Sequence, residues 1–86
     1  MGTMIHDGRV MGEFYGYRPG ATFVLDTGIS WVQVGQETAS ASTENPRCVV
    51  VCDASEGLRY FLYVSGMQGM TEIRRSDVGW SKADPA

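Results

Sequence analysis

The sequence predicts an all-β fold, a small SH3-like barrel of five or six short antiparallel strands. Eleven glycines separate short runs rich in β-branched and aromatic residues, and no apolar period of 3.6 residues lasts beyond about a turn. The chain has 86 residues, which suits one domain with one hydrophobic core. An OB-like barrel is the alternative, although the sequence offers no counterpart to the helix usual in that fold.

One domain is expected, from residue 8 to residue 75. Residues 1–7 are expected to form a flexible N-terminus. Residues 76–86 are expected to form a C-terminal tail, in which Val78 and Trp80 are apolar side chains suited to packing against the domain. The sequence shows no internal repeat, so these three parts account for the whole chain.

The first strand is expected over residues 8–15, with Val10 and Phe14 on one face because side chains four positions apart in a strand point the same way. A turn follows at residues 16–20. Its Pro-Gly pair is typical of turns, since proline fixes φ and glycine permits a positive φ.

A hairpin is expected over residues 21–34, reversing at Thr27 and Gly28. A two-residue loop there would place Val24 opposite Trp31. Directly paired residues share a face. The register therefore predicts a core face of Phe23, Leu25, Val32 and Val34 and an opposite face of Thr22, Val24, Trp31 and Gln33. A shift of one residue would reverse the assignment of one strand.

The second half of the chain contains three further predicted strands. Residues 35–45 are small and polar and are expected to form a mobile loop. The apolar run 47–53 predicts a strand covered on both faces. Residues 58–64 alternate, with Leu62 and Val64 on the core side, and residues 71–75 form a short closing strand.

Charge and hydropathy exclude some classes of partner. The net charge is −3, with six arginines and one lysine, and this argues against nucleic-acid binding and against anionic membrane surfaces. No apolar run approaches the roughly 18 residues of a membrane span. The first residues lack the basic head and apolar stretch of a signal peptide.

The two cysteines are expected to be free thiols. Cys48 and Cys52 would lie about 13 Å apart on one face of a strand, whereas a disulfide needs Cα atoms within about 7 Å. No second pair of Cys or His completes a tetrahedral metal site. Free thiols fit a reducing compartment, which predicts a cytoplasmic location. No cofactor and no metal are expected.

Part of the sequence resembles a family of small uncharacterised bacterial β domains. The resemblance is carried by an F-x-L-x-[N/T]-G-x-x-W-x-Q run, present here as Phe23, Leu25, Thr27, Gly28, Trp31 and Gln33. Looser matches are Gly16-Tyr17, Pro46-Arg47, Tyr60, Val64, Gly66, Ile73 and Arg75. Thr27 replaces the usual Asn, and the family's aromatic residues before the Pro-Arg pair are missing. The family implies the fold and no activity.

The run Leu25-Asp26-Thr27-Gly28 resembles the active-site loop of retroviral-type aspartic proteases, in which two subunits each supply one Asp to a proton-sharing dyad. The second hallmark of those enzymes, an apolar pair followed by Gly and a polar residue, is absent, and a turn explains the same residues. His6, the single histidine, has no Ser or Cys partner at a recognisable spacing. A dimeric protease is therefore the remotest hypothesis, and no catalytic residue is assigned.

The aromatic residues suggest a binding surface. Trp31, Phe61 and Tyr63 are predicted on faces opposite the core, and Tyr15 and Gln33 are expected nearby. Such a cluster would bind a peptide, another protein or a second copy of the chain. Single-stranded nucleic acid, stacked on the same rings, is the alternative ligand. Burial of these side chains under another part of the chain is the competing structural explanation.

Overall fold

The computed structural model describes residues 2–55 and 57–76. This part of the chain forms strands and turns without a helix, which confirms the all-β prediction. It therefore holds no helix that could cross a membrane. The strands are β1 (Gly2–Arg9), β2 (Glu13–Tyr17), β3 (Thr22–Val24), β4 (Ser30–Gln33), β5 (Ala39–Glu44), β6 (Arg47–Asp53), β7 (Arg59–Val64) and β8 (Thr71–Arg75).

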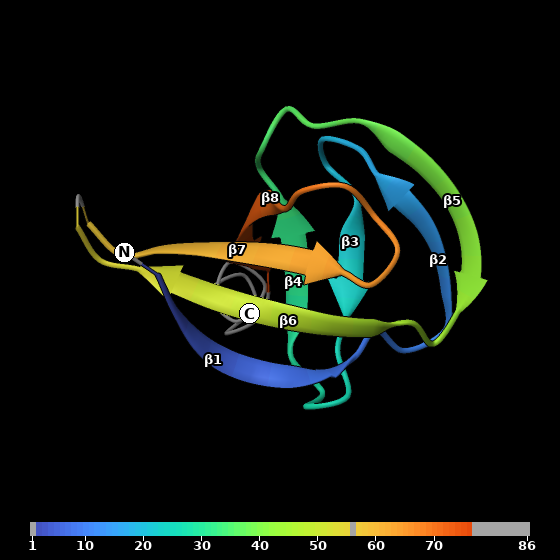
Figure 1. Ribbon diagram of the computed structural model, residues 1–86, viewed down its shortest axis with the longest axis horizontal. Coiled ribbons are helices and arrows are strands. Elements are labelled where there is room, and N and C mark those ends of the chain that lie inside the picture. The colour runs from blue at the N-terminus through green and yellow to red at the C-terminus, as the bar shows by residue number, and fades with distance from the viewer. Residues whose placement is uncertain (1, 56, 77–86) are drawn as a thin grey trace, which may run out of the picture.

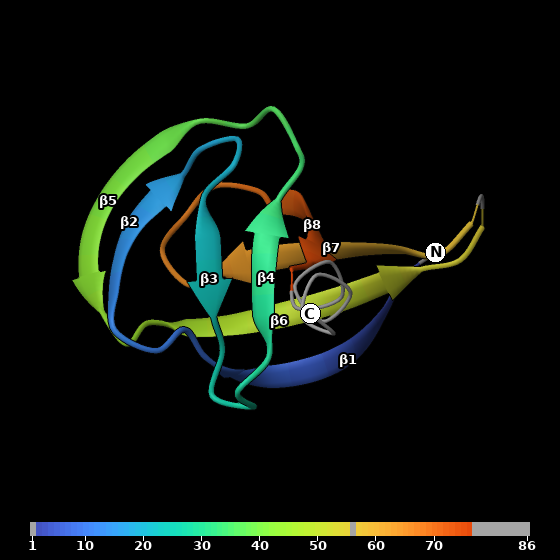
Figure 2. The ribbon, with the colours of Figure 1, turned by 180° about the vertical axis from the view of Figure 1, so that it is seen from behind.

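The strands form two antiparallel sheets. Six strands pair in the order β1-β6-β7-β8-β4-β3, and β2 pairs with β5 in a separate two-stranded sheet. Figure 1 shows β6 and β7 running across β3 and β4, with the curved β2–β5 pair to one side, and Figure 2 shows the same crossing from behind. The SH3-like barrel stays a prediction.

The two edges of the large sheet meet at one place. Val10, just after β1, forms an antiparallel bridge with Leu25, just after β3. The Asp26 N–H donates to the Arg9 carbonyl over 2.9 Å, and the Met11 N–H donates to the Val24 carbonyl over 2.7 Å. These contacts form a seam that joins the chain between β1 and β2 to the end of β3.

Two segments expected to be flexible are strands. Residues 2–7 belong to β1, which pairs with β6 from Gly2 to Arg9, so both the flexible N-terminus and the strand start at residue 8 are corrected. Most of the expected mobile loop 35–45 forms β5, which pairs with β2. Both strands expose most of their side chains, so backbone pairing holds them and the hydrophobic pattern gives little signal.

The β3–β4 hairpin has a three-residue loop, which corrects the predicted register by one position. The Leu25 N–H donates to the Ile29 carbonyl over 3.1 Å, and Phe23 pairs with Trp31. A two-residue type I′ loop would need positive φ at both central residues, which disfavours the β-branched Thr27. In the observed loop the positive φ falls on Gly28, at 88°.

The shifted register reverses the predicted faces of β4. Trp31 and Gln33 are 5% and 1% exposed and lie on the core side, and Val32 and Val34 are half-buried. The faces of β3 are confirmed, with Phe23 buried and Thr22 exposed. The core consists of Val10, Phe14, Tyr17, Phe23, Leu25, Trp31, Cys48, Val50, Leu62, Val64 and Ile73.

The predicted strands of the second half are confirmed. β6 and β7 pair in register from Cys48–Val64 to Asp53–Arg59, and β8 pairs with β7 and β4. Leu62 and Val64 point into the core as expected. The two cysteines are free, and neither forms a disulfide. The expected tail beyond Ser76, with Val78 and Trp80, lies outside the described residues.

Candidate functional site

The structure does not bring the predicted binding residues together. Trp31 is buried with its ring centroid 5.3 Å from that of Tyr60, and Gln33 is buried as well. Phe61 is half-buried beneath the Arg59 guanidinium, which lies 5.2 Å from the ring centroid. The predicted exposure of Trp31 and Gln33 is therefore wrong, because the hairpin register turns both side chains inward.

Tyr15 and Tyr63 are the predicted site residues that remain exposed. Tyr15 is 70% exposed and sits in β2, at the irregularity between Phe14 and Gly16. Tyr63 is 36% exposed and belongs to β7. Tyr15 lines a groove of about 510 Å³ between β2 and β3, whereas Tyr63 is not among the residues that line it. The groove is the candidate site.

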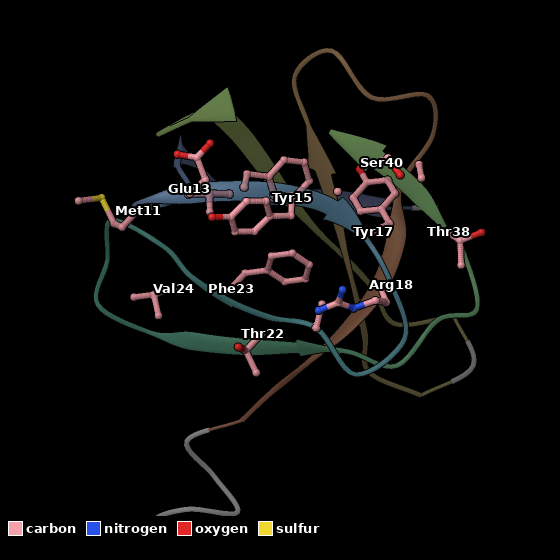
Figure 3. Close-up of a pocket in the computed structure, with 15 residues that line it drawn as sticks. Met11, Glu13, Tyr15, Tyr17, Arg18, Thr22, Phe23, Val24, Thr38 and Ser40 are labelled. Atoms are coloured by element: carbon pink, nitrogen blue, oxygen red, sulfur yellow. The ribbon is translucent and has the colours of Figure 1, made fainter. Parts of the chain in front are cut away.

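The floor of this groove is aromatic. The Phe14 ring lies 5.9 Å from that of Phe23 and 6.1 Å, edge-on, from that of Tyr17. Exposed Met11, Tyr15 and Val24 add apolar surface at its rim. Figure 3 shows β2 along one side and β3 along the other, with the Phe23 ring between them. Exposed apolar surface gathered beside a groove is typical of a binding site.

The edge of β3 that borders the groove carries unpaired backbone groups. Ala21 and Leu25 bond toward β4, so by strand alternation Thr22 and Val24 direct their N–H and C=O groups away from it. The seam occupies the Val24 carbonyl. The Thr22 N–H, the Thr22 carbonyl and the Val24 N–H have no backbone partner within residues 2–55 and 57–76. Such an edge can pair with an added strand.

Gln33 fixes one end of the groove from inside the molecule. Its side-chain oxygen accepts the Arg18 backbone N–H over 2.7 Å, and its amide nitrogen donates to the Gly35 and Glu37 carbonyls over 3.1 and 2.8 Å. This buried glutamine is therefore bonded on both its acceptor and its donor side. It holds the turn after β2 in place and so positions Arg18.

Tyr17 reinforces the same end. Its hydroxyl accepts the Val64 N–H over 3.1 Å and donates to the Gly69 carbonyl over 3.0 Å. Burial raises the pKa of Tyr17 above its ordinary value of 10, which keeps the hydroxyl protonated and able to donate. The bonds connect the end of β2 to β7 and to the turn that follows it.

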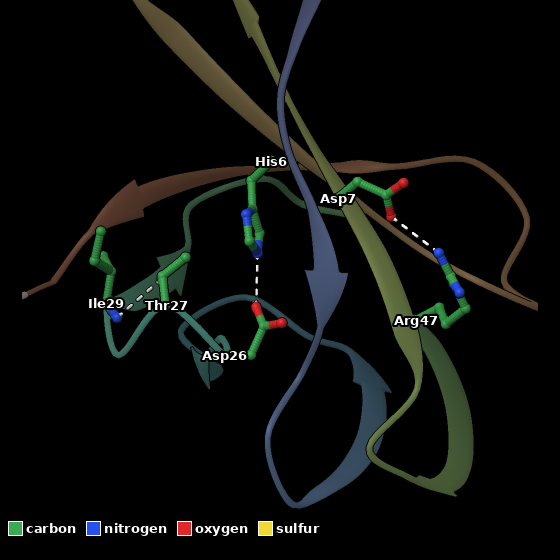
Figure 4. A network of polar contacts seen from close by, with 6 residues as sticks. All are labelled: His6, Asp7, Asp26, Thr27, Ile29 and Arg47. Atoms are coloured by element: carbon green, nitrogen blue, oxygen red, sulfur yellow. Dashed lines mark hydrogen bonds and ion pairs between the residues drawn. The ribbon is translucent and has the colours of Figure 1, made fainter.

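His6 and Asp26 form an exposed polar pair beside the seam. Figure 4 shows the His6 ring pointing at Asp26, with Nε2 donating to Oδ1 over 2.7 Å. The hydrogen bond from His6 holds the pKa of Asp26 below its ordinary value. Gly8 makes room for the pair, since a Cβ there would come within 2.4 Å of both groups. Asp26, the residue singled out by the protease resemblance, thus takes part in a contact within the chain.

Cys48 does not have the chemistry of a nucleophile. Burial, above all, raises the pKa of its thiol to about 11, so the reactive thiolate is scarce at neutral pH. Within the described residues, no group of three His, Cys, Asp or Glu side chains could hold a metal ion.

Two other hollows share an ion pair. Both are lined by Arg59 and Glu72, whose side chains bond to each other over 3.0 and 3.2 Å. The Arg59 guanidinium also holds the pKa of Glu72 below its ordinary value. The first hollow is also lined by Arg74 and Arg75, and the second by Glu37 and Asp53. The groove stays the candidate site because β3 presents an open strand edge to it.

Comparisons with family models, with curated proteins and with solved structures gave no match. Sequence analysis did not identify five residues that line the groove: Met11, Glu13, Arg18, Thr22 and Val24. Their only signal was the predicted exposure of Thr22 and Val24, which is confirmed.

Proposed function

We propose that this protein is a non-enzymatic interaction module that binds an extended segment of another protein in the groove between β2 and β3. The observation that carries the proposal is the edge of β3, where three backbone groups face the groove unpaired. A bound segment would complete this edge by strand addition and cover the exposed Tyr15 ring. The free thiols support a cytoplasmic setting.

A library of 12-residue peptides displayed on phage tests the proposal. Peptides selected on the wild-type protein are synthesised, and their affinity is measured by fluorescence anisotropy. Tyr15→Ala removes an exposed aromatic contact and should weaken binding about five- to thirtyfold. Tyr63→Ala, which removes the same side chain from outside the groove, is the matched control and should change the affinity less than about twofold.

A second pair of variants tests the strand pairing itself. Val24→Pro removes the N–H that faces the groove and leaves the bonds between β3 and β4 in place, since those use Phe23 and Leu25. It should weaken peptide binding about fivefold or more, whereas Val24→Thr, which keeps the N–H and the shape of the side chain, should weaken binding by less than about twofold. The proposal fails if no peptide is selected, or if binding follows Tyr63 rather than Tyr15 and Val24.

A further inference from the structure

The two ends of the groove carry opposite charges. Glu13 lies on β2 at the same end of the groove as Met11 and Val24, with its carboxylate on the side of β2 toward β5, and Arg18 lies at the other end, toward Thr22 and Tyr17 (Figure 3). The Glu13 carboxylate accepts one hydrogen bond, from Ser42 over 3.3 Å. The Arg18 guanidinium forms no ion pair with any residue of the described chain. Each end thus offers a charge to a ligand.

The direction of β3 relates these charges to the polarity of a bound segment. β3 runs from Thr22, at the Arg18 end of the groove, to Val24, at the Glu13 end. A strand added antiparallel to β3 would begin beside Val24 and end beside Thr22, and antiparallel pairing is slightly more stable than parallel pairing. Its N-terminal side would then meet Glu13, and its C-terminal side would meet Arg18.

We propose that the ligand is an extended segment with a basic residue on its N-terminal side, apolar residues in the middle and a carboxylate on its C-terminal side. This inference rests on the proposed peptide-binding function. Arg18 follows Glu13 by five positions, which is about 16 Å in an extended chain, so the two ligand charges stand about five positions apart. The apolar residues between them contact the exposed Tyr15 ring and Val24 side chain.

A ligand that carries its two charges in the reversed order would lose both attractions to the groove, and each of its charges would also be repelled by a like charge of the protein. A carboxylate on the N-terminal side would face Glu13, and a lysine on the C-terminal side would face Arg18. Such like-charge contacts are a common source of specificity between ligands of equal size and composition. Both groove charges are exposed, so the preference should be modest and should shrink as salt is added.

Two capped peptides of identical composition test the inference: acetyl-KTVTVE-amide and acetyl-ETVTVK-amide. Each is titrated into the ¹⁵N-labelled protein at low ionic strength, and the shifts of the Thr22 and Val24 amide signals are followed. The first peptide should bind about three- to tenfold more tightly, as expected for two exposed ion pairs. The difference should fall toward unity at about 1 M salt, where the Debye length is about 3 Å.

A charge exchange in the protein provides the decisive variant. Glu13→Arg combined with Arg18→Glu keeps the net charge and should reverse the preference between the two peptides. The matched control is Asp7→Arg combined with Arg47→Glu, which exchanges a pair that lies 3.4 Å apart and does not line the groove. This control should leave the preference as in the wild type.

The outcomes separate the inference from the function on which it rests. Equal binding of both peptides at the Thr22 and Val24 amides would overturn the charge order and leave the peptide-binding function intact. If neither peptide binds while library peptides do, the charge pattern is again wrong. Failure of the library as well would overturn both. Binding of a single-stranded oligo-dT, or concentration-dependent dimerisation through the same amides, in place of peptide binding would also contradict the inference.

Discussion

The two ends of the groove are held by different physical means. At the Arg18 end, the buried side chains of Gln33 and Tyr17 bond to backbone groups from several elements. At the Glu13 end, the support includes the exposed pair of His6 and Asp26, whose side chains are 24% and 40% accessible. A buried polar group costs much more to leave unpaired than an exposed one, so the Arg18 end should be the more rigid.

The largest effect on the stability of the fold is expected for Gln33→Met. Methionine fills a similar volume but leaves the Arg18 N–H and two carbonyls without their partner. We expect the free energy of unfolding in urea to fall by about 2–4 kcal/mol. Gln36→Met, at an exposed position three residues away, is the control and should change it by less than about 0.5 kcal/mol. Equal effects of the two substitutions would contradict the role of Gln33 as an anchor.

A smaller effect is expected for Tyr17→Phe. The substitution removes one hydroxyl and leaves the Val64 N–H and the Gly69 carbonyl unpaired, while the ring contact with Phe14 is kept. Unfolding free energy should fall by about 1–2 kcal/mol. Tyr15→Phe removes the same hydroxyl from an exposed ring and should leave stability unchanged. If Tyr17→Phe is also silent, the buried hydroxyl does not hold this end.

The smallest effect on stability is expected for Asp26→Asn, at the Glu13 end of the groove, and this effect should depend on pH. The pKa of Asp26 is lowered by the hydrogen bond from His6, so the ionised carboxylate stabilises the fold above its unfolded pKa near 3.8. This stabilisation is lost as the pH falls through the lower pKa of the folded state. Asp26→Asn should therefore reduce stability most at neutral pH, and the difference from the wild type should shrink below about pH 4.

Denaturation curves at a series of pH values would measure that difference, and His6→Ala supplies an independent check. Without its histidine partner, the pKa of Asp26, followed by NMR of the side-chain carboxyl carbon, should rise toward the ordinary value. An unchanged pKa would show that the exposed pair does not form in solution.

The sequence predicted the strands that carry a strong hydrophobic pattern and missed those that do not. The run from Cys48 to Cys52 and the alternation around Leu62 identified β6 and β7. β5, with the composition ASASTE, pairs through its backbone and buries little, so the sequence resembled a loop. The same holds for most of β1.

The candidate site was predicted only in part. Tyr15 was expected to bind and lies in the groove, whereas Trp31 and Gln33 are buried. The cause is one loop residue, because a three-residue turn around Thr27 shifts the register and every side chain of β4 changes face. Arg18 and Glu13 gave no signal in the sequence, since neither belongs to a recognisable motif.

The sequence by itself determined the class of fold, the positions of the apolar strands and the free state of both cysteines. These follow from local composition, spacing and alternation, which are properties of neighbouring residues. The tertiary structure decided which face of β4 is buried, which strand edge stays open and which charges stand at the ends of the groove. These depend on hydrogen bonds between segments that are distant in the chain, and no local pattern specifies such pairings.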